Sequence, residues 1–136
     1  MDVVWCFGVL YHHPSPYHLL VALRKMCGQK LLLETLTIPE HRGMPNLAVY
    51  FPMLSAKHRQ LWVLDWNAPR QYGLTDDYRH ELTYDNNFWG MTPSCVRALL
   101  ATAGFEVEET VPSPSGSFRH LFICRPSAAP PMPAAG

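Results

Sequence analysis

The sequence has 136 residues, enough for one compact domain and too few for two ordinary ones. Its 11 basic and 11 acidic side chains cancel, so no general positive field attracts nucleic acid, and no DNA partner is expected. No apolar run approaches the ~18 residues that a membrane-spanning helix needs, so no membrane partner is expected either.

The N-terminal segment has the pattern of a parallel β-α-β unit. Val3 to Leu10 is a short, almost wholly apolar run, which indicates a strand buried on both faces. Ser15 as N-cap, Pro16 at the first helical position and Gly28 just past the end delimit a helix. Lys30 to Ile38 is predicted to be a second buried strand. Because a crossover helix joins the two strands, they are expected to run parallel.

Residues 39–88 show no sustained periodicity and are predicted to form an insertion, with a helix indicated at Ser55 to Trp66. A stretch of this length without clear structure inside a compact domain is typical of a lid or a binding insertion.

Regular patterns return after the insertion. Thr92 and Pro93 repeat the cap-then-proline start, and Gly104 ends the predicted helix. Phe105 to Val111 and Phe118 to Arg125 are predicted strands, and the loop between them is too short for a parallel crossover, so they form an antiparallel hairpin. Residues 126–136 are rich in Pro and Ala and are predicted to be a disordered tail.

The four cysteines are scattered, with no CxxC spacing, and each falls in a predicted apolar strand or helix: Cys6, Cys27, Cys95 and Cys124. This distribution favours reduced, buried thiols and therefore a cytoplasmic location.

Three stretches carry a resemblance to a known family. MDVVWCFGVLYHHPSP is similar to its fourth strand and the following turn, KLLLETLTI to its fifth strand, and NNFWGMTPSCVRALLATAGFEVEE to a late aromatic segment, helix and Gly-Phe exit. Together they resemble the C-terminal half of a class I S-adenosylmethionine-dependent methyltransferase. The most similar branch is that of the wobble-uridine tRNA carboxymethylating enzymes and their relatives.

The resemblance implies a fold, a cofactor and a reaction. The fold would be α/β, a partial Rossmann-like sheet over residues 1–125 that lacks its first strands. The cofactor would be S-adenosylmethionine or a carboxylated derivative, and the reaction would transfer a methyl or modified methyl group to a small molecule or an RNA base. In such sheets ligands bind outside the carboxyl ends of the strands. The residues at the carboxyl end of the first strand, Gly8, Val9, Leu10 and Tyr11, would therefore hold the methionine end of the cofactor.

Four residues are candidates for contact with the acceptor: His12, Glu34, Asn87 and Trp89. Glu34 interrupts an apolar strand, and a buried carboxylate needs a partner or a raised pKa. A substrate contact and a structural hydrogen bond to the insertion both remain open for it. Trp89, with Phe88, either stacks on a planar base or packs in the core beneath the insertion.

The adjacent His12 and His13 do not indicate a metal site. On extended backbone neighbouring side chains point to opposite sides, and no further ligand stands at helical spacing. No metal is expected.

The family's glycine-rich cofactor turn precedes its fourth strand, and this sequence contains no comparable GxGxxG loop. The chain is therefore expected to be inactive by itself: either it is the end of a longer enzyme, or another chain supplies the N-terminal half. Its first strand would form an apolar sheet edge. The alternative is a non-catalytic interaction subunit that pairs through this edge. A His-dependent hydrolase is disfavoured because GxSxG is absent.

Overall fold

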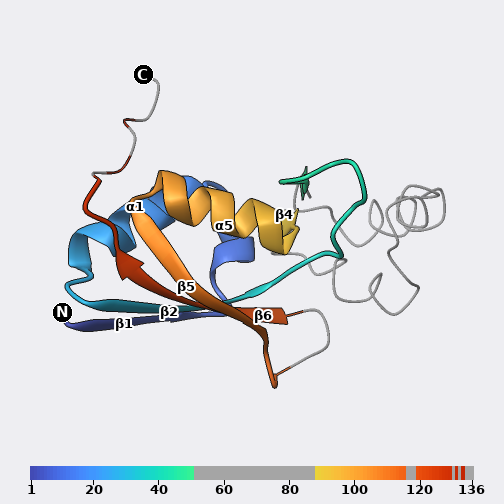
Figure 1. The fold of residues 1–136 in the computed structure, drawn as a ribbon. Coiled ribbons are helices and arrows are strands. Elements are labelled where there is room, and N and C mark those ends of the chain that lie inside the picture. Colours follow the sequence, from blue (N-terminus) through green and yellow to red (C-terminus); the bar gives the residue numbers. More distant parts are fainter. Residues whose placement is uncertain (51–87, 116–118, 130, 132, 134–136) are drawn as a thin grey trace.

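The computed structural model describes residues 1–50, 88–115, 119–129, 131 and 133. A four-stranded sheet has the order β1-β2-β6-β5 (Figure 1), formed by Val3–Phe7 (β1), Lys30–Leu36 (β2), Arg119–Pro126 (β6) and Phe105–Pro112 (β5). β1 and β2 are parallel, and β6 is antiparallel to both of its neighbours. The predicted α/β class, the parallel β-α-β unit and the antiparallel hairpin are confirmed.

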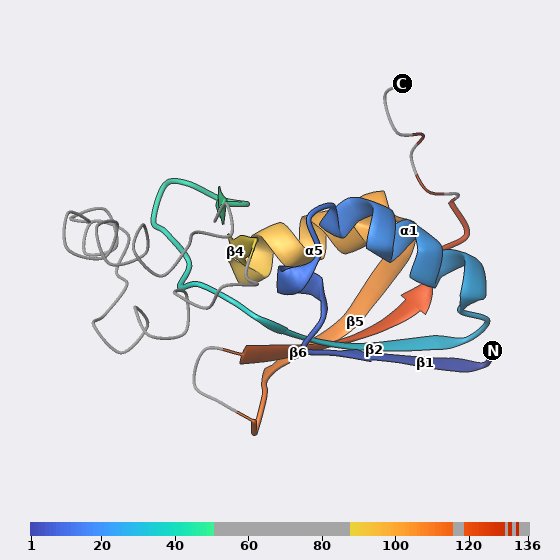
Figure 2. The same ribbon diagram turned by 180° about the vertical axis from the view of Figure 1, so that it is seen from behind.

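Helices α1 (Pro16–Met26) and α5 (Pro93–Thr102) both cover the same face of the sheet, as Figures 1 and 2 show from opposite sides. Their apolar stripes pack on the sheet because residues three and four apart share one side of a helix. The fully buried core includes Leu20, Leu31, Leu33, Val96, Leu100, Phe105 and Phe122.

The other face of the sheet carries no helix within the described residues, and this corrects one prediction. Val4 and Cys6 of β1 are each only 6% exposed, but Val3, Trp5 and Phe7 are 47%, 69% and 47% exposed. β1 is therefore buried on one face, because both helices lie on the side of Val4 and Cys6. It also ends at Phe7, three residues earlier than predicted.

The two helices start with similar sequences but different caps. The Thr92 hydroxyl accepts a hydrogen bond from the Cys95 amide and donates one to the Leu47 carbonyl. Ser15 makes no side-chain cap; its hydroxyl is hydrogen-bonded to His18 instead. Gly104 follows α5 with a φ of +91°, a left-handed conformation that favours glycine.

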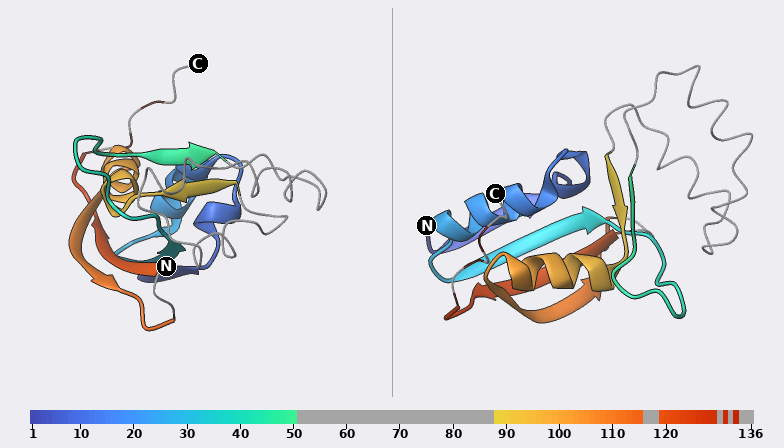
Figure 3. Two further views of the ribbon diagram at one scale, coloured as in Figure 1. Left: turned by 90° about the vertical axis from the view of Figure 1, so that its right-hand side faces the viewer. Right: turned by 90° about the horizontal axis from the view of Figure 1, so that it is seen from above.

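The ends of the predicted insertion form a small second sheet. Ala48–Tyr50 (β3) pairs antiparallel with Trp89–Met91 (β4), and this pair lies beside the N-terminal end of α5 (Figure 3). The carboxylate of Glu40 accepts hydrogen bonds from the amide and hydroxyl of Ser94, which attaches the start of the insertion to α5. The helix predicted at Ser55–Trp66 lies outside the described residues.

The start of the predicted tail is held against the domain. Pro126 belongs to β6, and the Ser127 amide donates to the Gly104 carbonyl. Arg24 of α1 donates to the carbonyls of both Gly104 and Ser127, at 2.8 and 3.0 Å. The tail prediction is therefore wrong for Pro126 and Ser127, because these contacts link α1, the end of α5 and the end of β6.

All four cysteines are buried and free, as predicted. Burial raises the pKa of Cys6 to about 11 and that of Cys124 to about 12, so both thiols are neutral near pH 7. No helix in the described ranges is long and apolar enough to cross a membrane.

The N-terminal residues of the two helices, Thr92 and Ser15, should contribute differently to the free energy of unfolding. Thr92→Ala should lower the free energy of unfolding by about 1–2 kcal/mol, because it removes a buried cap and a hydrogen bond to Leu47. Ser15→Ala should cost less than about 0.5 kcal/mol, because no cap bond is lost. Urea unfolding followed by circular dichroism measures both. Equal costs for the two variants would contradict the assigned caps.

Candidate functional site

The candidate site lies where β1 and β2 reach their carboxyl ends, a position that we call the rim and define by Gly8 to His12 and Glu34. The last residue of β1, Phe7, is the register partner of Glu34. The Gly8 amide then donates to the Glu34 carbonyl, and the φ of Gly8 is +68°, which turns the chain out of the sheet. A single 3-10 turn, η1 (Leu10–His12), follows. The left-handed glycine is therefore the reason why the strand ends at Phe7 and not at Leu10.

The four predicted cofactor residues differ in accessibility. Val9 is 43% exposed, and Gly8 is half-buried, with no atom closer than 3.9 Å to the position of an added Cβ. Leu10 is fully buried in the core, and Tyr11 is only 6% exposed. A ligand at this turn would therefore meet the backbone of Gly8 and the side chain of Val9 first.

A four-residue hydrogen-bonded group, which we call the Arg119 cluster, connects the rim to the hairpin: Tyr11, Glu34, Ser115 and Arg119. Arg119 donates to the Tyr11 hydroxyl at 2.8 Å and to the two carboxylate oxygens of Glu34 at 3.2 and 3.4 Å. Its guanidinium carbon lies 5.3 Å from the centre of the Tyr11 ring. The hydroxyl of Ser115 donates to Glu34 at 3.0 Å.

These contacts explain the buried carboxylate that the sequence brings into an apolar strand. Glu34 accepts from the hairpin loop and from β6, and the described residues show no hydrogen bond to the insertion, one of the two alternatives that the sequence left open. Burial lowers the pKa of Arg119, but its bonds to Tyr11 and Glu34 raise it more, so the guanidinium remains charged. The ion pair leaves the cluster close to electrically neutral.

An open hollow of about 540 Å³ lies beside the Arg119 cluster. Because Phe7, Glu34 and Leu121 are neighbours across three strands, their side chains share the sheet face that has no helix. Both apolar and polar residues line the hollow: Phe7, Gly8, Glu34, Ser113, Pro114, Ser115, Arg119 and Leu121.

The predicted acceptor residues His12 and Trp89 lie beside the turn that follows β1. The ring of His12 lies 4.0 Å from that of Tyr11. The indole of Trp89 donates to the Pro14 carbonyl at 3.1 Å and lies 4.9 Å from the Tyr50 ring. The Phe88 amide donates to the Tyr11 carbonyl. The segment of Trp89 thus borders the rim, while Asn87 lies outside the described residues.

The two adjacent histidines have separate structural contacts. Nδ1 of His13 accepts a hydrogen bond from the Ser15 amide, and His12 belongs to the 3-10 turn rather than to extended backbone. Within the described residues, no group of three or more His, Cys, Asp and Glu side chains is arranged to hold a metal ion.

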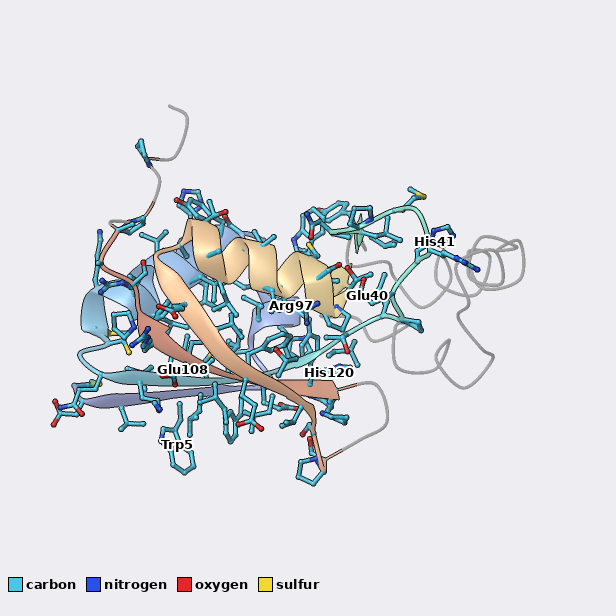
Figure 4. The ribbon with its side chains drawn as sticks, viewed as in Figure 1. Trp5, Glu40, His41, Arg97, Glu108 and His120 are labelled. Atoms are coloured by element: carbon cyan, nitrogen blue, oxygen red, sulfur yellow. The ribbon has the colours of Figure 1, made fainter. Side chains whose placement is uncertain are left out.

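A second polar group lies near the start of α5, where Figure 4 labels His120, Glu40 and Arg97. Nδ1 of His120 is 2.6 Å from the Thr37 hydroxyl. Burial, and secondarily the charge of Arg97, lowers the pKa of His120, while Glu40 opposes the shift. The imidazole is therefore neutral near pH 7 and stabilises the packing of β6 on the end of β2.

Arg119 is the site residue that the sequence did not reveal. It is one charged residue in a predicted strand of the hairpin, and nothing in its spacing relates it to Tyr11, which precedes it by 108 residues. The only sequence signal for such a residue was Glu34, because a carboxylate in an apolar strand requires a cationic or hydrogen-bonding partner.

Comparisons with known proteins agree with the fold of the sheet. No family model matches the sequence, and no curated protein matches it. The structure is similar to human N-acetylserotonin methyltransferase in complex with S-adenosylmethionine, with a TM-score of 0.52 and 18% identity over 93% of this chain. Two structures of the N-terminal domain of EvdMO1, one with S-adenosylhomocysteine and D-fucose and one with S-adenosylhomocysteine, each match at 19% identity and a TM-score of 0.46. These two matches cover 94% and 95% of this chain, and 47% of the EvdMO1 chain in each case.

The first of these structures defines the class of fold. The chain has the α/β fold of the C-terminal part of a methyltransferase domain, and it spans 30% of the length of that enzyme.

The Arg119 cluster predicts non-additive stability changes. Arg119→Met should destabilise the protein by about 1–3 kcal/mol, a range reduced for the partial exposure of the pair, because it leaves the Glu34 carboxylate without its cation. Adding Glu34→Gln to this variant should recover part of the loss. Arg125→Met, which breaks the exposed pair with Glu106, should have a much smaller effect.

Urea unfolding of the single and double variants measures this coupling. Additive costs of Arg119→Met and Glu34→Gln would show that the two side chains do not stabilise each other.

Proposed function

We propose that this chain is the C-terminal half of an S-adenosylmethionine-dependent methyltransferase domain, and that it transfers a methyl or modified methyl group only together with an N-terminal half. The observation that carries the proposal is the turn at Gly8, at the carboxyl end of a parallel strand, in a sheet with a methyltransferase fold. Ligands of open parallel sheets bind at such strand ends. The structure of human N-acetylserotonin methyltransferase, which has a similar fold, contains S-adenosylmethionine, and this supports the same cofactor here.

The residues at the turn fit one end of this cofactor. Gly8 allows close approach of a ligand to the backbone, and the exposed Val9 offers an apolar surface to a methylene chain. The Tyr11 hydroxyl is held by Arg119, so its ring and oxygen are oriented before any ligand binds. When bound, the cofactor would supply an electrophilic methyl group on its sulfonium. The sequence contains no glycine-rich turn for the nucleoside end.

A carboxylated cofactor, and with it the wobble-uridine branch, is the finer form of the proposal. An additional carboxylate needs a cationic partner, and Arg119 places a guanidinium at the Tyr11 hydroxyl. Because Glu34 already pairs with this guanidinium, the cluster would have to share the charge between two carboxylates.

The acceptor would bind at the side of the rim formed by His12 and Trp89, with Glu34 and Asn87 as the remaining proposed contacts. The rings of Tyr50 and Trp89 bring aromatic surface to this side, which suits a planar small molecule or an RNA base. Catalysis would depend on alignment of donor and acceptor rather than on acid-base chemistry. We place this reaction in the cytoplasm, consistent with four free thiols.

The second candidate, an interaction subunit without catalytic activity, is favoured by the exposed side chains of β1. Val3, Trp5 and Phe7 lie on an edge strand, and such edges are templates for pairing with another chain. A chain that supplies the N-terminal half would also dock on this edge.

Titration of the ¹⁵N-labelled full chain with S-adenosylmethionine tests the proposed cofactor site. We expect amide shift changes centred on Gly8 and Val9, with a dissociation constant of about 1 mM or weaker because only one end of the cofactor is held. Gly8→Ala should abolish these changes. Gly43→Ala is the matched control, because Gly43 also has a positive φ, of +86°, and no atom within 4 Å of an added Cβ.

Shift changes confined to other parts of the chain would contradict the proposed site. Micromolar affinity would show that the chain needs no second half to hold the cofactor.

A further inference from the structure

Two aromatic side chains of the small sheet lie opposite each other across its strands. Tyr50, the last residue of β3, is the register partner of Trp89, the first residue of β4, so the two side chains share one face of this sheet. Their ring centres are 4.9 Å apart, with an angle of 52° between the ring planes. Tyr50 is nevertheless 51% exposed, so its side chain remains accessible to a ligand beside Trp89.

Two hydrogen bonds hold this aromatic pair next to the proposed cofactor turn. The Trp89 indole donates to the Pro14 carbonyl at 3.1 Å, and the Phe88 amide donates to the Tyr11 carbonyl at 2.9 Å. Figure 2 shows β4 close to the turn that follows β1. Because paired strands lie about 5 Å apart and successive Cα atoms about 3.8 Å apart, the Cα atoms of Tyr50 and Tyr11 are separated by at most about 15 Å. A small molecule on the Tyr50 ring would therefore lie within reach of the turn.

The geometry of the pair suits a planar ligand. The bond to Pro14 fixes the Trp89 indole, and the contact with Trp89 restricts the Tyr50 ring, so little freedom is lost when a ligand stacks there. Aromatic rings stack on any planar π system, and one such contact contributes a measurable part of the affinity. A saturated ring of the same size offers no π face to Tyr50.

The charges of the chain favour a small uncharged ligand over RNA. Binding of RNA depends strongly on basic side chains that neutralise phosphates. Arg24 donates to two backbone carbonyls. Residues 51–87 contain four Lys or Arg and five Asp or Glu residues, so they add no positive charge. Of the seven Lys and Arg residues that the structure describes, four are in ion pairs with carboxylates: Lys30, Arg97, Arg119 and Arg125.

We propose that Tyr50 determines acceptor specificity, and that it stacks, beside Trp89, on a small, uncharged, planar molecule. This inference rests on the proposed function and narrows its acceptor, because a base within RNA would bring phosphates that the described residues are poorly equipped to neutralise. It also adds a residue to the acceptor site, since the sequence indicated Trp89 but gave no reason to select Tyr50.

Titration of the ¹⁵N-labelled full chain with 2-naphthol, an uncharged bicyclic molecule, tests the stacking surface. We expect shift changes at the Tyr50 amide and the Trp89 indole N–H, with a dissociation constant of about 1 mM, and none with cyclohexanol. Tyr50→Ala should weaken binding at least about fivefold because one stacking ring is lost, whereas Tyr50→Phe should keep it within about twofold. Met26→Ala, which truncates a 45% exposed side chain on α1, is the matched control and should leave the affinity unchanged.

Three results would overturn the role of Tyr50. They are equal weakening by Tyr50→Phe and Tyr50→Ala, equal binding of cyclohexanol, and shift changes centred on the exposed Trp5 instead of Trp89. Single-stranded octauridylate tests the class of acceptor and should leave the Tyr50 and Trp89 signals unchanged at low salt. Binding of octauridylate that Tyr50→Ala weakens would show that the acceptor is RNA and contradict the assignment to a small molecule.

The cofactor titration separates a failure of this inference from a failure of the proposed function. S-adenosylmethionine should shift Gly8 and Val9 equally in the wild type and in Tyr50→Ala, because Tyr50 belongs to the acceptor side. Cofactor shifts at Gly8 without naphthol contacts at Tyr50 would contradict the role of Tyr50 alone. Naphthol contacts at Tyr50 without any cofactor shifts would contradict the proposed function, and with it an acceptor at Tyr50.

Discussion

The register of β2 with both of its neighbours determines where the candidate site lies. Glu34 is opposite Phe7 at the end of β1 and opposite Leu121 in β6. Its carboxylate is therefore directed to the helix-free face at the carboxyl end of β1. Arg119 lies two residues before Leu121, on the same face of β6, so it reaches Glu34 and Tyr11 together. A shift of one residue in either pairing would move these side chains to opposite faces.

The Arg119 cluster makes this geometry stable. A buried carboxylate without a partner would be costly, and here a guanidinium and a serine hydroxyl satisfy it. The same guanidinium orients the Tyr11 hydroxyl, so one ion pair joins the turn after β1 to the hairpin at the far end of the sequence. The proposed cofactor turn is thus attached to the sheet through this cluster, in addition to the hydrogen bond from the Phe88 amide to the Tyr11 carbonyl.

The two helices cover only one face of the sheet. Both helices pack on the side of Val4 and Cys6, which leaves the hollow and the exposed residues of β1 on the other side. In the methyltransferase with the similar fold, this chain corresponds to 30% of the length. The exposed Val3, Trp5 and Phe7 make β1 suited to association with the remaining part of a domain, as the proposed function requires.

Local patterns in the sequence determined the elements and much of their arrangement. The cap-then-proline starts at Ser15 and Thr92, the apolar runs and the glycines after each helix predict two helices and four main strands, because these signals act over a few residues. The parallel β1–β2 pair and the antiparallel hairpin followed from the lengths of their connections. The position of Tyr11 and Glu34 at strand ends was also predictable, since both follow directly from strand direction.

Only the tertiary structure decided which partners these residues meet. The position of β6 between β2 and β5 in the sheet brings Arg119 to Glu34. Sequence periodicity carries no information about contacts between residues that lie so far apart in the chain. The tertiary structure also decided that Trp5 is exposed while Val4 and Cys6 are buried. An apolar run has the same pattern whether one or both of its faces are covered, because burial depends on which other elements pack against the strand.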